Sequence, residues 1–163
     1  MSKINHIRLE QLNCAISDKD GFVKIYANAA PLKQTYHSPG AIPVGRVRSL
    51  SLDSLIRDSL KEGESLTHVK MDIDGYEPAF FAGGKDTLKK FNPLIMMEFW
   101  PKGLKVSGWD LDDYWNMLQD DYSVKEASFP SRLLHPLSRK DLTYLIEKTK
   151  NGITNLVLIP RPA

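Results

Sequence analysis

The sequence predicts an α/β domain whose sheet is mostly parallel, with one late antiparallel strand. Stretches with strand character alternate with stretches of helical periodicity along most of the chain. The succession of a strand at His68 to Ile73, helical segments, and an apolar strand at Pro93 to Phe99 is typical of a parallel crossover. The Asn151-Gly152 pair before the apolar run 153–159 permits a final antiparallel strand.

Size and composition predict one cytoplasmic domain, residues 1–163, and exclude several protein classes. The 22 basic and 20 acidic residues nearly balance and form no run of five like charges, so nothing indicates a nucleic-acid partner. Every apolar run is far shorter than the roughly 20 residues of a membrane-spanning helix, which excludes a membrane span. The single cysteine, Cys14, and a polar amino end without a signal-peptide core are typical of a reducing compartment.

In the first part of the chain, hydrophobic spacing and turn residues predict two neighbouring strands, a long loop, a further strand and a helix capped by Ser51. In that order, these segments cover Ile7 to Ile16, Phe22 to Tyr26, Ala27 to Gly45, Arg46 to Leu50 and Leu52 to Leu60.

The second part continues the alternation after Gly63. Gly83-Gly84 separates two short helices, and the following strand is so apolar that burial on both faces is expected. Ser107 and Asp110 resemble a capping box for the next helix. The expected elements are a strand at His68 to Ile73, helices at Tyr76 to Ala82 and Lys85 to Phe91, a strand at Pro93 to Phe99, a helix at about Trp109 to Gln119, a strand at Tyr122 to Ala127, a helix that opens at Ser138, and a strand at 153–159.

Acidic residues gather at the carboxyl ends of two predicted strands. Alternate side chains of a strand share a face, so Asp72 and Asp74 are expected roughly 7 Å apart on one side. If the next strand is a parallel neighbour, Glu98 opens onto the same crevice as Asp72. Three carboxylates in one crevice repel each other unless a cation, a hydrogen-bond donor or a proton intervenes. These residues and nearby Glu77 are the candidate catalytic groups.

The run Lys70-Met71-Asp72-Ile73-Asp74-Gly75-Tyr76-Glu77 resembles the hallmark of FkbM-type methyltransferases, with Asp74 where Glu is usual. Further landmarks of that family follow in register from about Asn5 to Glu98. They are Ala15-Ile16-Ser17-Asp18 with Gly21, Ser51-Leu52-Asp53-Ser54-Leu55, Gly83-Gly84, and Pro93 to Glu98.

This resemblance implies a Rossmann-like class I methyltransferase sheet and S-adenosylmethionine as the methyl donor. In the family, the donor lies on the first two strands, which carry a glycine-rich turn and a ribose-binding acid. The present chain begins at what would be the third strand, so the expected sheet is truncated at its amino end. The resemblance assigns the adenine side to Asn13-Cys14-Ala15 and the floor of the crevice to Asp72. It also implies transfer to an oxygen of a small-molecule or glycan-like acceptor.

Other readings of the same residues stay open. Asp72-Ile73-Asp74 is compatible with a glycosyltransferase that binds a divalent cation, and Asp72 with Glu98 could hold a metal, although no histidine lies at a useful spacing and no metal ligand set is predicted. His37 could contact the substrate as a general base or be an ordinary loop residue. Asp72 could simply pair with Lys70.

A non-catalytic, methyltransferase-like interaction module is the alternative from a different class. Without the first two strands, the flank of the third strand is an unpaired sheet edge, and such edges need a covering. A homo-oligomer or a partner chain over this edge is therefore expected.

Overall fold

The structure is a computed structural model that describes residues 9–27, 42–127, 134–148 and 153–162. Its elements, in chain order, are β1 (Ala15–Ile16), β2 (Gly21–Ala27), β3 (Ile42–Leu50), α1 (Leu52–Ser59), β4 (His68–Met71), α2 (Glu77–Ala82), α3 (Lys85–Phe91), β5 (Leu94–Phe99), α4 (Pro101–Val106), α5 (Leu111–Gln119), β6 (Tyr122–Ala127), β7 (Leu134–Pro136), α6 (Arg139–Lys148) and β8 (Thr154–Pro160).

The strands form two sheets of mixed direction. The larger sheet has the order β4-β5-β8-β6-β7, and only its β4–β5 pair is parallel among the described strands. The smaller sheet has the order β1-β3-β2, in which β1 is parallel and β2 antiparallel to β3. The predicted crossover and late antiparallel strand are confirmed, but the expectation of a mostly parallel sheet is wrong. The first two strands are also not neighbours, because β3 pairs between them.

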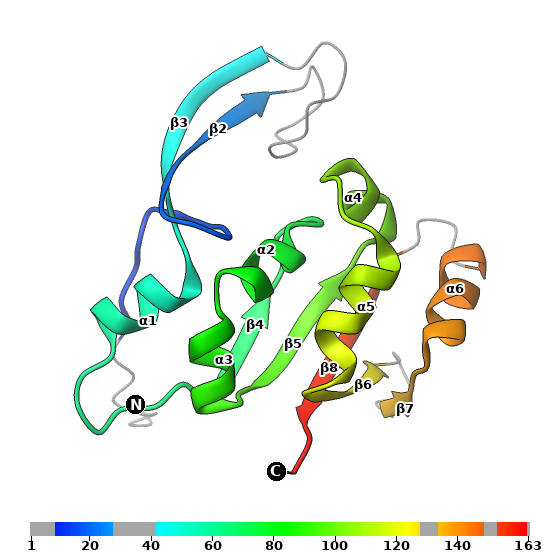
Figure 1. The fold of residues 1–163 in the computed structure, drawn as a ribbon. Helices are drawn as coiled ribbons and strands as arrows, with labels where there is room; N and C mark the ends of the chain where they lie inside the picture. Colours follow the sequence, from blue (N-terminus) through cyan, green and yellow to red (C-terminus); the bar gives the residue numbers. More distant parts are fainter. Residues whose placement is uncertain (1–8, 28–41, 128–133, 149–152, 163) are drawn as a thin grey trace, which may run out of the picture.

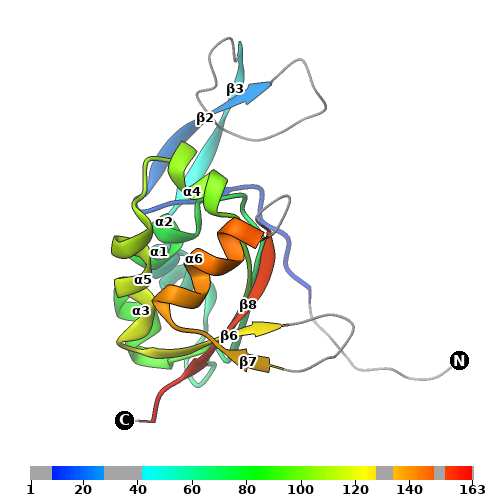
Figure 2. The same ribbon diagram turned by 90° about the vertical axis from the view of Figure 1, so that its right-hand side faces the viewer.

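Helices cover one face of the larger sheet. Figures 1 and 2 show α2, α3, α5 and α6 on the same side of this sheet, and the described part of the chain places no helix on the opposite side. Ile95 and Met97 of β5 point into the helix-covered core, whereas Met96 between them is 43 % exposed. The prediction that this strand is buried on both faces is therefore wrong. We call the surface around Met96 the bare face of the sheet.

The local signals around the crossover are confirmed. The Ser51 hydroxyl caps α1 by accepting from the Ser54 N–H at 3.2 Å. Its own backbone N–H donates to Asp20 Oδ1 at 2.8 Å, which ties α1 to the turn after β1. Proline lies in the first turn of α2, where its missing N–H costs little. Gly83 and Gly84 separate α2 from α3 as predicted.

Several local predictions are wrong. Helix α4 and strand β7 are additional elements, and α5 begins at Leu111 with Asp110 alone as its side-chain cap. The Ser107 hydroxyl makes its hydrogen bonds outside α5. The predicted first strand shortens to Ala15–Ile16, and Leu9 is 87 % exposed. Most of the predicted loop Ala27 to Gly45 and the Asn151-Gly152 turn lie outside the described residues.

The β2–β3 ribbon is set apart from the rest of the fold. It projects beyond the helices and the larger sheet in both views (Figures 1 and 2). The ribbon is antiparallel, with a register irregularity between Ile25 and Tyr26. Among the described residues, no helix is both long enough and apolar enough to cross a membrane.

Candidate active site

A tight turn at the carboxyl end of β4 forms the centre of the candidate site. Asp74 has a φ of 53° and Gly75 a φ of 94°, and the Tyr76 N–H donates to the Ile73 carbonyl at 3.3 Å. Two central residues with positive φ are the pattern of a type I′ turn. Aspartate tolerates this left-handed conformation better than most residues, which gives Asp74 a structural reason to precede the glycine.

Helix α4 closes over this turn. A Cβ built on Gly75 would lie 2.4 Å from the Gly103 carbonyl carbon, so only glycine permits the contact. The Ser107 hydroxyl, at the end of α4, lies 2.7 Å from the Gly75 carbonyl oxygen and 2.9 Å from that of Leu104. The turn is therefore held by two contacts with α4 and its C-terminal cap.

Three acidic side chains meet at the turn, which confirms the predicted juxtaposition of Asp72 and Glu98. One carboxylate oxygen from each of Asp72, Asp74 and Glu98 lies within 4.8 Å of the others, and we call this group the acidic trio. Partial burial, and then the charges of Asp72 and Asp74, raise the pKa of Glu98. Each member offers an oxygen of the kind that a hard divalent cation accepts. The trio can equally act on a proton or a positive charge.

Glu77 lies beneath the turn, apart from the trio. Its side chain is 2 % exposed, and Glu77 Oε1 accepts from the Ile73 N–H at 3.4 Å. Burial raises the pKa of Glu77 to about 7, although hydrogen bonds from the backbone N–H groups of Glu77, Ile73 and Gly75 oppose the shift. Glu77 is thus a buried acid that supports the turn, and its carboxyl group does not open onto the crevice.

An apolar pocket adjoins the turn on the side of the smaller sheet. It has a volume of about 400 Å³, and Cys14 and Ala15 line it together with Ile73 and Tyr76 of the turn. The structure therefore brings two of the three residues predicted on the adenine side next to the Lys70–Glu77 motif. We call this cavity the β1 pocket. Its other walls come from Ile16, Ser17, Val23, Lys24, Ile25 and Val47.

The remaining predicted site residues have different positions. Asn13 is exposed and does not line the β1 pocket. His37 lies outside the described residues. Lys70 Nζ lies 4.0 Å from Asp72 Oδ2, with both side chains more than half exposed. An exposed pair of this kind contributes little to stability, so Asp72 remains available to a ligand.

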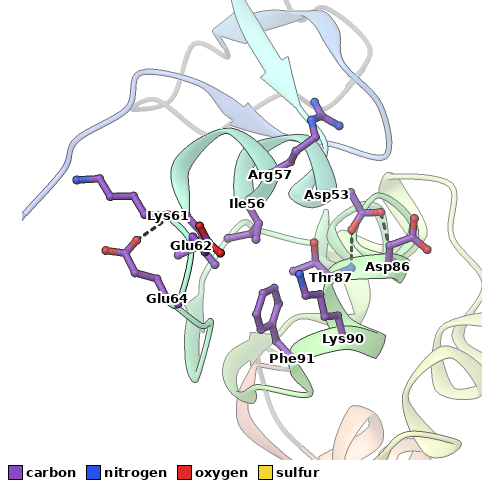
Figure 3. A pocket seen from close by; sticks show the side chains of 12 residues that line it. Asp53, Ile56, Arg57, Lys61, Glu62, Glu64, Asp86, Thr87, Lys90 and Phe91 are labelled. Carbon is purple, nitrogen blue, oxygen red and sulfur yellow. Dashed lines mark hydrogen bonds between the residues drawn. The ribbon is translucent and has the colours of Figure 1, made fainter.

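A second pocket lies between α1 and α3, and no member of the acidic trio lines it (Figure 3). Asp53 on its wall accepts from the Thr87 N–H at 2.8 Å and the Asp86 N–H at 3.4 Å. Asp53 therefore caps the start of α3 from another helix. Arg57, Lys61 and Lys90 supply positive charge around this pocket, while Glu62 and Glu64 supply negative charge. Because charges of both signs line this pocket, the lining does not indicate any one class of ligand.

Several residues that hold the fold around the site have no signal in the sequence that would identify their roles. Asp53 caps a helix more than thirty residues downstream, and Gly103 meets Gly75 only in the folded chain. Tyr76 and Ile73 belong to the motif, but their place in the β1 pocket depends on the smaller sheet. The spacing in the sequence predicts only that the three acids lie at the ends of strands.

Comparison with known proteins decides the family. The sequence matches the Methyltransferase FkbM domain over residues 2–122. The chain belongs to the FkbM methyltransferase family. No curated protein and no solved structure matches it.

The structure shows that several FkbM family landmarks in this chain are architectural. Asp53 caps α3, and a Cβ on Gly83 would lie 2.4 Å from the Ser17 carbonyl oxygen, so this glycine lets α2 approach the turn after β1. These two landmarks therefore join α1 to α3 and bring α2 close to Ser17, a wall residue of the β1 pocket.

Proposed function

We propose that this chain transfers a methyl group from S-adenosylmethionine to an oxygen atom of a small-molecule or glycan-like acceptor. One observation carries the proposal. The β1 pocket is built partly by Ile73, and the residues on either side of Ile73 belong to the acidic trio. An apolar cavity and a cluster of carboxylates thus flank the same turn in a member of the FkbM family.

The chemistry of these two surfaces fits the donor. Its adenine ring is planar and largely apolar at its faces, which suits a cavity lined by Cys14, Ala15, Ile73 and Tyr76. Its sulfur carries a positive charge, which is stabilised near carboxylates. When bound, the donor supplies a methyl group on that sulfur, which leaves as a neutral thioether.

The acidic trio provides a proton acceptor for the reaction. Transfer to a hydroxyl forms a carbon–oxygen bond, breaks the carbon–sulfur bond and releases the hydroxyl proton. Glu98 is suited to accept that proton, because burial and its acidic neighbours raise its pKa and a higher pKa makes a stronger base. Asp72 and Asp74 provide the negative field on both sides of Ile73, and Glu77 holds the turn in place.

Calorimetric titration of the chain with S-adenosylmethionine tests donor binding. We expect saturable binding that Asp72→Ala weakens about tenfold, the effect of losing one charged contact. Lys61→Ala, on the pocket of Figure 3, is the matched control and should bind like the wild type. Absence of heat at millimolar donor, or equal binding by Asp72→Ala, would contradict the proposal and favour a non-catalytic module.

Methyl transfer is tested with radiolabelled donor and a panel of sugars and small alcohols. The rate should rise with pH as Glu98 loses its proton, and Glu98→Gln should remove this rise while donor binding stays within about twofold. An unchanged pH profile in Glu98→Gln would remove Glu98 as the base.

A further inference from the structure

Acidic residues are missing from one long part of an otherwise balanced chain. Residues 21–52 contain no aspartate or glutamate, although the whole sequence has 20 acidic residues. The described part of this stretch is the β2–β3 ribbon with the start of α1, and its cations are Lys24, Arg46 and Arg48. The described ribbon therefore carries basic side chains and no acidic ones, which makes it a positively charged surface.

The ladder between the two strands places these cations on one face of the ribbon. Lys24 is directly opposite Arg46, and Phe22 is directly opposite Arg48. Because alternate residues of a strand share a face, the two pairs lie on the same side. The guanidinium carbon of Arg46 is 4.9 Å from the centre of the Phe22 ring, which confirms this arrangement. We call Phe22, Lys24, Arg46 and Arg48 the basic face.

The other face of the ribbon belongs to the β1 pocket. Val23 and Val47 pair across the ladder and line that pocket together with Ile25. Lys24 stands between two of these wall residues, and alternation turns its side chain to the opposite side. The basic face thus points away from the proposed donor site, and methyl transfer does not account for its charge.

The positive charges of the basic face have no counterion in the part of the chain that the structure describes. Among the described residues, none forms an ion pair with Lys24, Arg46 or Arg48. Asp20, the acid just before the ribbon, instead accepts from the N–H and the hydroxyl of Ser51 at 2.8 and 3.0 Å. Like charges directly opposite each other destabilise a ladder, so the Lys24–Arg46 pair is unfavourable unless an anion lies beside it.

Exposed apolar side chains accompany these cations. Phe22, Ile42 and Val44 all belong to the ribbon, and each is more than half exposed. Large apolar side chains that gather on an exposed surface mark an interaction site. At a bilayer surface, such side chains enter the headgroup boundary while neighbouring cations meet acidic lipids. A nucleic-acid backbone would engage the cations but would leave Ile42 and Val44 in water.

We propose that the basic face docks this chain on a membrane surface that contains acidic phospholipids. The docking is independent of methyl transfer. Lys24, Arg46 and Arg48 lie at the lipid phosphates, and Phe22 enters the headgroup boundary. The ribbon projects beyond the helices and the larger sheet, so a flat bilayer reaches it before it meets the rest of the fold (Figures 1 and 2).

Co-sedimentation with lipid vesicles tests the proposal. One set of vesicles is phosphatidylcholine alone, and the other contains about one third phosphatidylserine. Each cation near an acidic surface contributes about fivefold to partitioning, so we expect at least about tenfold stronger binding to the acidic vesicles at low salt. This preference should disappear near about 1 M salt, where charges are screened. No binding to the acidic vesicles, or equal binding to both sets, would overturn the proposal.

Two triple variants with the same net charge form the matched comparison. They are Lys24→Gln with Arg46→Gln and Arg48→Gln on the basic face, and Lys85→Gln with Lys89→Gln and Lys90→Gln on α3. The lysines of α3 are exposed, and Lys90 lies over the Phe91 ring as Arg46 lies over that of Phe22. We expect the variant of the basic face to lose roughly a hundredfold in binding to acidic vesicles, and the α3 variant to stay within about threefold of the wild type.

The variant of the basic face should fold normally, because it removes like charges from the ladder, and circular dichroism checks this. Equal losses in the two triple variants would overturn the proposal, because net charge alone would then explain the binding.

Phe22→Ala and Leu9→Ala separate a membrane from other polyanions. Both positions are largely exposed, but only Phe22 belongs to the basic face. We expect Phe22→Ala to bind acidic vesicles about fivefold more weakly, and Leu9→Ala to bind like the wild type. Equal binding by Phe22→Ala and the wild type would overturn the proposal. So would tighter binding of a labelled single-stranded oligonucleotide than of acidic vesicles at the same salt, because the face would then recognise nucleic acid.

Discussion

Glu77 carries an ionisable carboxyl group, yet its side chain is buried inside the fold. Its carboxyl group lies under the Asp74–Gly75 turn, near the fully buried phenol of Tyr114, whose pKa is raised by burial and then by the Glu77 charge. The hydroxyl of Tyr114 donates to Met97 Sδ at 3.3 Å. Helix α5 therefore covers Glu77 from a region of the chain that no local pattern connects with the motif.

Burial of Glu77 predicts that stability falls as pH rises. Its pKa of about 7 in the folded chain exceeds the ordinary value of 4.5, so between these values the folded state keeps a proton that the unfolded state releases. The stabilisation is complete below pH 4.5 and is lost as pH passes 7. A shift of this size corresponds to roughly 3 kcal/mol. Glu77→Gln removes the titration, so the wild type should lose that amount relative to the variant across this window.

Urea unfolding of both proteins at several pH values measures this difference. Glu62→Gln, at an exposed position after α1, serves as the control and should follow the wild-type curve. Parallel pH curves for the wild type and Glu77→Gln would show that the acid is not stabilised in its protonated form.

At the scale of elements, the contact between α4 and the turn after β4 determines how much stability a substitution at Gly75 costs. Gly75 and Gly63 both have positive φ, but only Gly75 has a backbone neighbour where a Cβ would stand. Gly63→Ala should cost about 1 kcal/mol from backbone strain alone. Gly75→Ala adds a clash with Gly103 and should cost at least about 3 kcal/mol.

Thermal and urea unfolding of these two glycine variants separate strain from packing. Similar losses of stability in both variants would mean that the contact between α4 and the turn adds no packing cost. The chain offers a clean comparison here, because both positions follow an acidic residue and lie in connections between regular elements.

The elements themselves could be predicted where their signals were local. Ser51, Pro78 and Gly83-Gly84 act within a few residues of the helix ends that they determine, so α1, α2 and α3 follow from the sequence. Helix α4 was missed because Pro101 and Gly103 usually indicate a break, although proline is tolerated in a first turn. Ser107 has the hydroxyl group of a typical helix cap, but this hydroxyl donates to the Gly75 carbonyl oxygen instead.

At the scale of the whole molecule, strand direction was the hardest property to predict. Residue patterns place β8 and β6 in the sheet, but β8 pairs between β5 and β6, an order that no local pattern specifies. The same limit applies to the site. The acidic trio follows from strand-end positions, whereas the β1 pocket needs two sheets to meet.

The projecting β2–β3 ribbon predicts uneven local stability. Phe22 and Val44 are largely exposed, so the ribbon is held mainly by its own ladder and by contacts near its base. Its amides should exchange with deuterium at least about a hundredfold faster than those of β5 and β8, equivalent to an opening free energy lower by nearly 3 kcal/mol. Mass spectrometry of peptides from each region measures this. Equal protection would show that the ribbon unfolds only with the whole chain.

The bare face of the larger sheet makes one methionine chemically vulnerable. Met96 is 43 % exposed while its neighbour Met97 is fully buried, so dilute peroxide should convert Met96 to its sulfoxide well before Met97. Peptide mapping after brief treatment would reveal the order, and equal oxidation would mean that the core opens on the same timescale. Oxidative ageing should therefore begin on this face, and any molecule that covers it in the cell would act as a shield against that damage.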